Sequence, residues 1–414
     1  FRRRAPESLA ETWRVSLPGG GSAGISGPPA GQIIRRNQAP YWSPKTKASV
    51  SWMSSSRGIF TAPWYKGKSG YFLAAAFIGR GSFLGIPVNS LGGEIAGPFE
   101  FLRIRKPMKR ITVFGGSGFL GRRIVLGLAA GGAAVRVAVR HPERASHLEG
   151  AAGKGTVELL RADVWDEKSV ARAVRDSGSV INTVGHYVEK SGATFDAVHG
   201  QGALHVARQA GEVGVRRLIH ISGLGADPSS DSPYVKARGI GEALVREAFV
   251  DATILRPSVI FGPEDAFFNR LFDMARLAPV LPLFGRGLTK LQPVFVDDVA
   301  EACARALADP VTAGKVYELG GPRVYTYADL LRLVVERTGR NRLLLPVPFF
   351  VWEGMAALMA ILPNPPLTQD QVKLMKGDNV VGAAALTLAE LGIAPASVED
   401  ILPTYVNPDS QAIR

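Results

Sequence analysis

Three glycines, Gly115, Gly118 and Gly121, have the spacing of a phosphate-binding turn between an apolar stretch and a helical one. Glycine lets a phosphate approach the backbone closely, because no Cβ obstructs it. A helix that begins at such a turn directs its free N–H groups and positive dipole end at the anion. The spacing therefore predicts dinucleotide binding, with Phe119 and Leu120 in the first helical turn. The alternative is a purely structural turn.

The end of the next strand helps to choose the dinucleotide. An NAD site usually places Asp or Glu there to accept a hydrogen bond from the ribose 2′-OH. This chain has Arg140 at that point and no carboxylate before Glu143. A guanidinium suits a 2′-phosphate, so we favour NADP(H) over NAD(H). The alternative is that Arg140 is a solvated strand end.

Other expected cofactor contacts also follow predicted strands. The loop after the third strand holds Asp163 and could meet the adenine, although a helix N-cap near Lys168 is an equally good interpretation of this carboxylate. Further strands end close to residues on the side of the sheet where ligands bind. Together with Arg140, the expected contacts at the strand ends are Asp163, Val164, Thr183, Gly185, Tyr234 and Pro257.

The alternation of apolar strands and amphipathic helices after Met108 predicts the fold. Such alternation builds an α/β protein with a doubly wound parallel sheet, the Rossmann arrangement. The predicted strands are 111–114, 135–139, 157–160, 179–184, 217–222, 253–260 and 316–319. We expect four parts, which are an extension over 1–107, a nucleotide-binding core over 108–262, a substrate-side segment with the last core helix and strand over 263–324, and a small helical region over 325–414.

The composition bounds the class of protein. With 46% hydrophobic and 21% charged residues, the 414-residue chain is typical of globular proteins. Its single cysteine, Cys303, excludes an internal disulfide framework and is expected to be a small buried hydrophobe in a helix. Residues 1–107 hold 15 Lys and Arg but four Asp and Glu, so they carry +11 of the net +13. The remainder is nearly neutral, and we expect no nucleic-acid partner.

Residues 1–107 differ from the rest of the chain. They contain no Asp, four of the six tryptophans and many Gly, Ser and Pro residues, without a sustained helical or strand period. Three interpretations stay open: a disordered basic extension, an Arg- and Ser-rich targeting peptide, or a segment foreign to the natural protein. We favour the third, with Met108 as the native start.

Longer motifs carry a resemblance to a known superfamily. The glycine turn and the pair Ser222 and Tyr234 resemble those of extended and atypical short-chain dehydrogenases/reductases. Within that superfamily the chain is similar to the branch that contains the NADPH-binding accessory subunit of respiratory complex I and its bacterial relatives. The branch motifs, in a resemblance that covers Met108 to about Tyr405, are LRPSVIFGPEDAFFNR (255–270), LQPVFVDDVAEA (291–302) and PPLTQDQVKLMKGDNVV (365–381).

The resemblance implies a catalytic set and one departure from it. Superfamily enzymes use a tyrosine as general acid/base, a serine on the substrate carbonyl, and a lysine four residues after the tyrosine that lowers its pKa. Here Ser222 and Tyr234 match, but the fourth position holds Arg238, and Lys236 would lie on the opposite helix face. Arg places its donors differently and cannot give up its proton. Tyr234 as an active acid and Tyr234 as a packing residue both stay open.

The resemblance implies an NAD(P)H-binding accessory or assembly protein of respiratory complex I or of ubiquinone biosynthesis, with a structural nucleotide. The alternatives are an active NADP-dependent reductase or epimerase/dehydratase on a small or isoprenoid substrate, and a redox-sensing regulator. No metal site is expected, because the six histidines lack ligand spacing with carboxylates or cysteine.

The implied location is the cytoplasmic face of a bacterial inner membrane or the cytoplasm, with the mitochondrial matrix or inner membrane as the alternative. The stretch 343–362 is almost wholly apolar, with Glu353 as its one charged residue and two prolines that argue against a spanning helix. We expect a helix over 349–362 in peripheral contact with a membrane or a partner protein. The alternative is a buried helix of the small region.

Overall fold

The computed structural model describes residues 110–151, 153–189, 192–362 and 365–406, and the backbone of four short strands nearer the N-terminus. The chain divides into two compact units, 1–95 and 96–414. In the first unit β1 (Thr12–Ser16) pairs antiparallel with β2 (Ser22–Ser26), and β3 (Trp64–Gly67) with β4 (Gly70–Leu73), where we expected no strands. The three interpretations of residues 1–107, and the start at Met108, otherwise lie outside the described residues.

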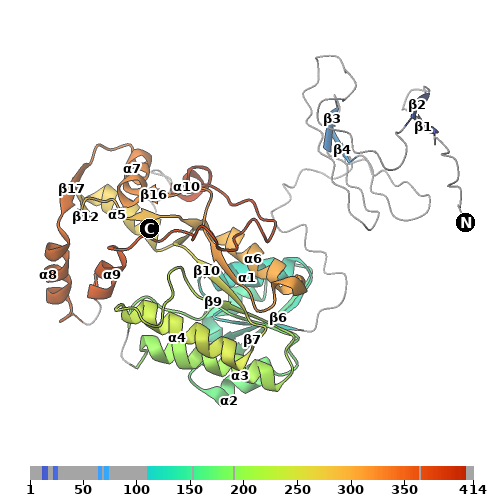
Figure 1. Cartoon of the computed structure of the whole chain (residues 1–414), viewed down its shortest axis with the longest axis horizontal. Coiled ribbons are helices and arrows are strands. Elements are labelled where there is room, and N and C mark those ends of the chain that lie inside the picture. The colour runs from blue at the N-terminus through green and yellow to red at the C-terminus, as the bar shows by residue number, and fades with distance from the viewer. Residues whose placement is uncertain are drawn as a thin grey trace, which may run out of the picture. The chain divides into compact units, whose positions relative to one another are not determined.

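A seven-stranded parallel sheet forms the centre of the second unit (Figure 1). Its strand order is β15-β10-β9-β8-β5-β6-β7, so the chain winds outward in both directions from the pair β5 and β8. This is the predicted doubly wound α/β fold. The strands are β5 (Ile111–Phe114), β6 (Ala134–Val139), β7 (Thr156–Arg161), β8 (Ser179–Asn182), β9 (Arg217–Ile221), β10 (Thr253–Pro257) and β15 (Val316–Leu319).

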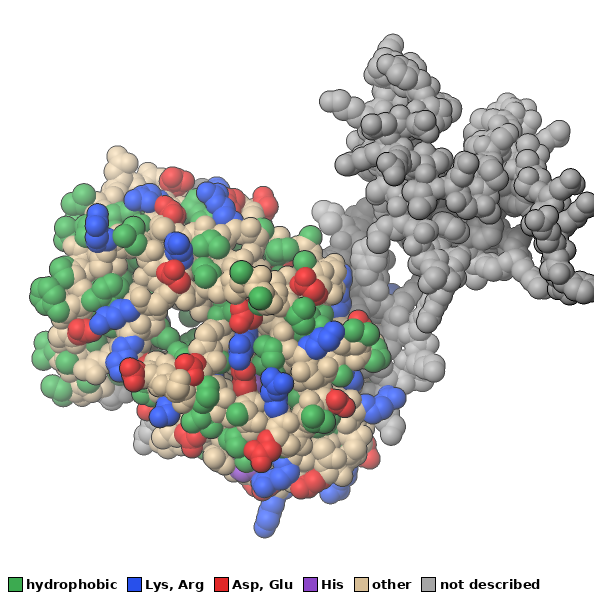
Figure 2. Space-filling view, in the orientation of Figure 1, with side chains coloured by type: hydrophobic (Ala, Val, Ile, Leu, Met, Phe, Trp, Pro, Cys, Tyr) green, Lys and Arg blue, Asp and Glu red, His purple; other side chains and the backbone are tan. Residues whose placement is uncertain are grey.

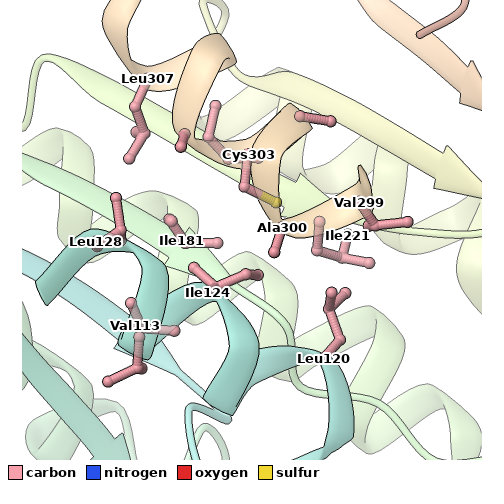
Figure 3. Packing of buried hydrophobic residues seen from close by; sticks show 14 of the residues in the cluster. Val113, Leu120, Ile124, Leu128, Ile181, Ile221, Val299, Ala300, Cys303 and Leu307 are labelled. Carbon is pink, nitrogen blue, oxygen red and sulfur yellow. The ribbon is translucent and has the colours of Figure 1, made fainter. Parts of the chain in front are cut away.

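Helices cover both faces of this sheet. On one face α1 (Phe119–Ala130) packs against α6 (Val296–Ala308), and on the other lie α2 (Glu167–Val174), α3 (Gly202–Glu212) and α4 (Pro233–Ala248) (Figure 1). Figure 3 shows apolar side chains of α6 facing those of α1 above the sheet. Cys303 lies in that layer with no exposed surface, and burial raises the pKa of its thiol, so the prediction of a buried hydrophobe is confirmed.

The predicted sixth strand, 253–260, is shorter than expected. It ends at Pro257, and the chain then leaves the sheet to form β11 (Ile260–Phe261), which pairs with β14 (Val294–Phe295). Pro257 has no N–H to donate, and the next residue, Ser258, makes a last backbone bond to the Leu319 carbonyl of β15 at 2.9 Å. This turn carries the chain out of the sheet and into a second, smaller lobe.

Short strands and helices build the smaller lobe. β12 (Val280–Phe284) pairs in parallel with β17 (Leu343–Val347), and β13 (Lys290–Leu291) pairs antiparallel with β16 (Tyr325–Thr326). Among the described elements, none combines the length and apolar character needed to cross a bilayer. The helices are α5 (Phe267–Leu277), α7 (Tyr327–Thr338), α8 (Phe349–Met359), α9 (Gln369–Leu374) and α10 (Val398–Tyr405).

The last described stretch returns to the sheet. Leu388, Leu391 and Ile393 belong to the same buried cluster as Ile124 of α1 and Val299 of α6. Tyr317 of β15 forms a β-bridge with Leu386. The C-terminal residues therefore complete the core of the nucleotide-binding half.

Candidate nucleotide-binding site

The glycine turn lies between β5 and α1 and is tightly built. Gly115 has a φ of +75°, and a Cβ there would lie 2.8 Å from Thr183 Oγ1, so a side chain is excluded on both counts. A Cβ on Gly121 would lie 2.2 Å from the carbonyl oxygen of Gly115, so this residue lets α1 start directly on the turn. The Gly118 N–H closes the turn by donating to the Gly115 carbonyl at 3.0 Å.

The N-terminus of α1 is free to bind an anion. Gly118 precedes the first turn, no side chain caps it, and no acidic residue lies in that turn. Gly118 is exposed and has no Cβ to occupy the space in front of the helix, while Phe119 is half-buried and Leu120 is buried. The backbone N–H groups and the helix dipole therefore fit a pyrophosphate at this point.

Arg140 lies at the end of β6, beside this turn. Its side chain is exposed, its guanidinium carbon lies 6.0 Å from the centre of the Trp165 ring, and no carboxylate pairs with it among the described residues. The adjacent His141 pairs instead with Glu143 at 3.1 Å. A guanidinium without an ion-pair partner at this position fits a 2′-phosphate.

The loop after β7 contains Asp163, which the sequence left as either an adenine contact or a helix N-cap. Asp166 is the N-cap of α2 and accepts from the Lys168 N–H, so the alternative that assigned this cap to Asp163 is wrong. Asp163 accepts instead from the N–H of Trp165 at 3.1 Å, within its own loop. Val164 is buried, and its carbonyl accepts from His205 Nδ1. Both residues lie at the sheet edge beside Arg140, and their contact with adenine stays a prediction.

The remaining predicted contacts lie along the same edge. Thr183 follows β8 and donates through Oγ1 to the Phe114 carbonyl at 2.7 Å, while Gly185 is exposed beside His199. Ser222 follows β9, and its N–H donates to the Leu255 carbonyl of β10 at 2.8 Å. Pro257 ends β10. Because parallel strands end at one edge of a sheet, the fold brings all these positions to the same side of the molecule.

Tyr234 and Arg238 lie one turn apart on α4, which begins with a cap by Ser232 and with Pro233 at its first position. Tyr234 is 7% exposed, and the Arg238 guanidinium carbon lies 4.7 Å from the centre of its ring. Burial raises the pKa of Tyr234 well above its usual range, although the charge of Arg238 opposes this shift. Lys236 is exposed on the other side of the helix, as predicted.

Arg238 also lies close to the ends of two strands. A Cβ on Gly223, just after β9, would lie 2.6 Å from Arg238 Nη1, and one on Gly185, after β8, would lie 3.8 Å from Nη2. The buried atoms Ser222 Oγ and Arg238 Nε have no hydrogen-bond partner among the described residues. A polar ligand group between these strand ends would supply the missing partners.

A cluster of aromatic rings around Tyr234 was missed by sequence reasoning. Ring centres of Tyr187, Phe195 and His199 lie 5.3, 5.5 and 5.5 Å from that of Tyr234. Burial, followed by the charge of Arg238, lowers the pKa of His199 to about 3, so its imidazole is neutral. The cluster gathers side chains from three separate segments, and the sequence contains no spacing pattern that would reveal it.

A cleft opens beside this cluster, where the loop before α4 faces α9. Its volume is about 590 Å³, and Ser230, Asp231, Ser232 and Lys373 line it. Leu374 of α9 packs against the group that contains Phe195 and Tyr234, so the smaller lobe covers Tyr234. Figure 2 shows the opening between the two lobes on one face. In the part of the chain that the structure describes, no three His, Cys, Asp or Glu residues gather as a metal site requires.

The fold and this edge of the sheet define a class of protein. The model of the NAD dependent epimerase/dehydratase family matches residues 111–320, and the chain belongs to this family. The predicted superfamily is therefore confirmed.

Individual relatives indicate a narrower group within this family. The chain is 34% identical over 291 residues to "NADH dehydrogenase [ubiquinone] 1 alpha subcomplex subunit 9, mitochondrial" of Mus musculus, covering 70% of this chain and 77% of that protein. It is 32% identical over 297 residues to the "NADH-ubiquinone oxidoreductase 40 kDa subunit, mitochondrial" of Neurospora crassa, covering 71% and 78%. A more distant relative, the ceramide reductase of Caulobacter vibrioides, is 30% identical over 244 residues, or 58% of this chain and 73% of that protein. The predicted similarity to a complex I subunit is thus confirmed.

Solved structures agree on the fold. A Citrobacter triphenylmethane reductase complexed with NADP(H) matches with a TM-score of 0.58 and 19% identity, over 72% of this chain and 99% of that one. The Thermus thermophilus UDP-glucose 4-epimerase complexed with NAD matches with a TM-score of 0.53 and 21% identity, over 73% and 100%. Bound dinucleotides of both kinds occur on this fold, which therefore supports NAD(P) without choosing between them.

Proposed function

We propose that this protein is an accessory subunit or assembly protein of respiratory complex I that holds NADP(H) as a structural ligand. The glycine turn and the free N-terminus of α1 would hold the pyrophosphate, and Arg140 would hold the 2′-phosphate. Arg238 would contribute a donor near the nicotinamide ribose. The mouse and Neurospora relatives, named as subunits of NADH dehydrogenase (ubiquinone), support this partner.

The observation that carries the structural role of the nucleotide is the environment of Tyr234. An acid/base catalyst works best with a pKa near the working pH. Burial moves the pKa of Tyr234 in the opposite direction, and Arg238 stacks on its ring. With the smaller lobe packed over it, Tyr234 is better suited to hold α4 against the site than to exchange a proton with a substrate.

The proposed location follows from the proposed partner. A subunit of complex I would lie at the membrane that contains the complex, on the matrix side in a mitochondrion and on the cytoplasmic face in a bacterium. Proteins of ubiquinone biosynthesis are the alternative partners, since they work at the same membrane.

The test combines native mass spectrometry with affinity purification from the native membrane. We expect the purified chain to retain an NADPH-sized ligand that stays reduced with a panel of quinones and carbonyl compounds. We also expect a tagged full-length chain to purify with complex I subunits from detergent-solubilised membranes. Free exchange and oxidation of the nucleotide, or purification without any respiratory subunit, would refute the proposal.

A second function, an NADP-dependent reductase, is favoured by the unpartnered Ser222 Oγ and Arg238 Nε. Two such donors could bind a substrate carbonyl beside a nicotinamide, and the nucleotide when bound would supply the hydride. The relative named ceramide reductase is consistent with this chemistry. Tyr234→Phe should then abolish turnover while nucleotide binding is unchanged, and an unaltered rate would exclude Tyr234 as the acid.

A further inference from the structure

Exposed apolar side chains gather on one part of the smaller lobe. They are the outward side chains of β17 and α8 and of the residues just after α8. Phe350, Leu358 and Ile361 are 73%, 72% and 84% exposed. We name this surface the apolar edge, and its main members are Leu343, Phe350, Met355, Leu358, Ile361 and Leu362. Figure 2 shows hydrophobic side chains gathered where Figure 1 places β17 and α8.

The inner face of α8 packs against neighbouring elements of the smaller lobe. Trp352 and Ala356 are buried against Val372 of α9, and Trp352 Nε1 donates to the Leu283 carbonyl of β12 at 3.1 Å. The rings of Trp352 and Phe284 stack with centres 4.3 Å apart. The helix is thus firmly held, yet its outer face is as apolar as its inner one. A helix that is apolar all round is normally covered on both sides, so the exposed outer face of α8 calls for an explanation.

The stretch 340–362, which contains the apolar edge, carries two positive charges and one negative charge. Glu353 is the one acidic residue between 343 and 362, and it pairs with Lys376 of α9. Arg340 and Arg342, just before β17, donate to carbonyl oxygens at the end of α5 at 2.7 and 2.6 Å. No carboxylate pairs with either guanidinium among the described residues, so both keep a net positive charge.

We infer that the apolar edge docks on an anionic lipid bilayer, with Phe350, Leu358 and Ile361 in the hydrocarbon boundary and Arg340 and Arg342 at the phosphates. Protein interfaces carry a polar rim with hydrogen bonds, whereas the polar side-chain groups of α8 already have partners within the chain: Glu353 pairs with Lys376, and Trp352 Nε1 donates to the Leu283 carbonyl. The helix has 11 residues and is about 16 Å long. It would lie along the bilayer, because the hydrocarbon core is about 30 Å thick.

This inference goes beyond the proposed function and does not depend on it. A subunit held by protein contacts alone would satisfy that function with no lipid contact. Conversely, membrane docking would survive if the nucleotide proved to be catalytic. Failure of one is therefore distinguishable from failure of the other.

The experiment uses a fluorophore on the full chain, because the basic residues before 108 could themselves attract anionic vesicles. Cys303 has no exposed surface, so Leu358→Cys can be labelled selectively with an environment-sensitive dye. Vesicles of phosphatidylcholine with phosphatidylglycerol should shift the emission to the blue, and brominated acyl chains should quench it. Val250→Cys, 77% exposed in the Rossmann half, is the matched control and should not respond.

A second variant tests the energy of docking. Phe350→Ser with Leu358→Ser should lower the vesicle partition coefficient at high salt by about tenfold or more, since each side chain loses its apolar burial. Val250→Ser should leave it unchanged. An unshifted dye at position 358, or equal partitioning of the double variant and this control, would overturn the inference. So would loss of complex I binding in the double variant with vesicle binding intact, because a protein would then cover this surface.

Discussion

The guanidinium of Arg238 stacks on the face of Tyr234, with its central carbon 4.7 Å from the ring centre. In the Y-x-x-x-K arrangement that the family resemblance implies, a lysine ammonium would be available for the nucleotide and the phenol. Here the positive charge lies over a buried ring and also contacts the exposed Tyr187, 5.9 Å from its ring centre. The charge opposes the effect of burial on the phenol pKa without reversing it. Tyr234 therefore stays protonated throughout the physiological range.

Arg238→Met should weaken NADPH binding by about tenfold, the value of one hydrogen bond to a charged group. The reason is that Arg238 Nε and Ser222 Oγ lack partners among the described residues, so a ligand would pair with them. Calorimetric titration measures the change. Arg246→Met, an exposed change on the same helix, is the control. Equal affinities in the two variants would mean that Arg238 serves packing alone.

Arg140→Glu should reverse the nucleotide preference. We expect the unaltered protein to bind NADPH at least about tenfold more tightly than NADH, because the 2′-phosphate gains a charged hydrogen bond. The glutamate repels that phosphate but accepts from a ribose 2′-OH. Fluorescence titrations with both nucleotides measure the ratio. Arg216→Glu makes the same charge change before β9, at the opposite edge of the sheet, and should preserve the preference. No change of the ratio in Arg140→Glu would contradict NADP selection by this residue.

Two glycine substitutions should separate binding from folding. Gly118→Ala places its Cβ 3.3 Å from the Gly115 carbonyl oxygen, which must then move by a few tenths of an ångström, and the methyl group obstructs the approach of a phosphate. It should lose nucleotide affinity with little change in the free energy of unfolding. Gly121→Ala would place a Cβ 2.2 Å from that oxygen and should cost about 3 kcal/mol of stability. Denaturant unfolding and nucleotide titration of both variants check this, and wild-type affinity in Gly118→Ala would contradict a phosphate at the turn.

Asp298 should make stability depend on pH. Its carboxylate accepts from the Ala396 N–H at 2.8 Å, yet burial raises its pKa to about 6, with smaller contributions from Glu301 and Asp297. The folded state then binds more protons than the unfolded state between about pH 4 and pH 6, so this group's contribution to stability falls as pH rises through that range. Asp298→Asn keeps an acceptor and removes the charge.

Asp298→Asn should therefore match the unaltered protein at pH 4 and exceed it in free energy of unfolding at pH 7. Urea unfolding of both proteins from pH 4 to pH 8 gives the difference curve, in which the titration of groups that do not interact with Asp298 cancels. A flat difference curve would show that Asp298 has an ordinary pKa in the folded state.

The sequence predicted the sheet well because its signals are local. Apolar strands, the glycine turn and the position of Arg140 each depend on residues within a few positions of one another. The aromatic cluster around Tyr234 could not be predicted, since His199 and Tyr187 reach it from different segments. The sequence also left the N-cap residue of α2 undecided, because Asp163 and Asp166 are both suitable caps and lie only three positions apart.

Helix α8 illustrates a different limit of sequence-based prediction. Its apolar composition indicated either a buried or a surface helix, and the exposure of Phe350 and Leu358 rules out a fully buried one. The helix also ends at Met359, three residues before the predicted end. Composition alone cannot separate these cases, because burial depends on which elements of the smaller lobe pack nearby.

The return of the C-terminal stretch to the core has a consequence for the order of synthesis. Leu388, Leu391 and Ile393 belong to the buried cluster that α1 and α6 also form, although the glycine turn is translated more than 260 residues earlier. The nucleotide-binding half cannot complete its own interior while the ribosome is still adding the smaller lobe. A truncation before residue 388 thus leaves an open hydrophobic layer in the half of the protein that still has all seven strands, and premature release would deliver that exposed surface to chaperones.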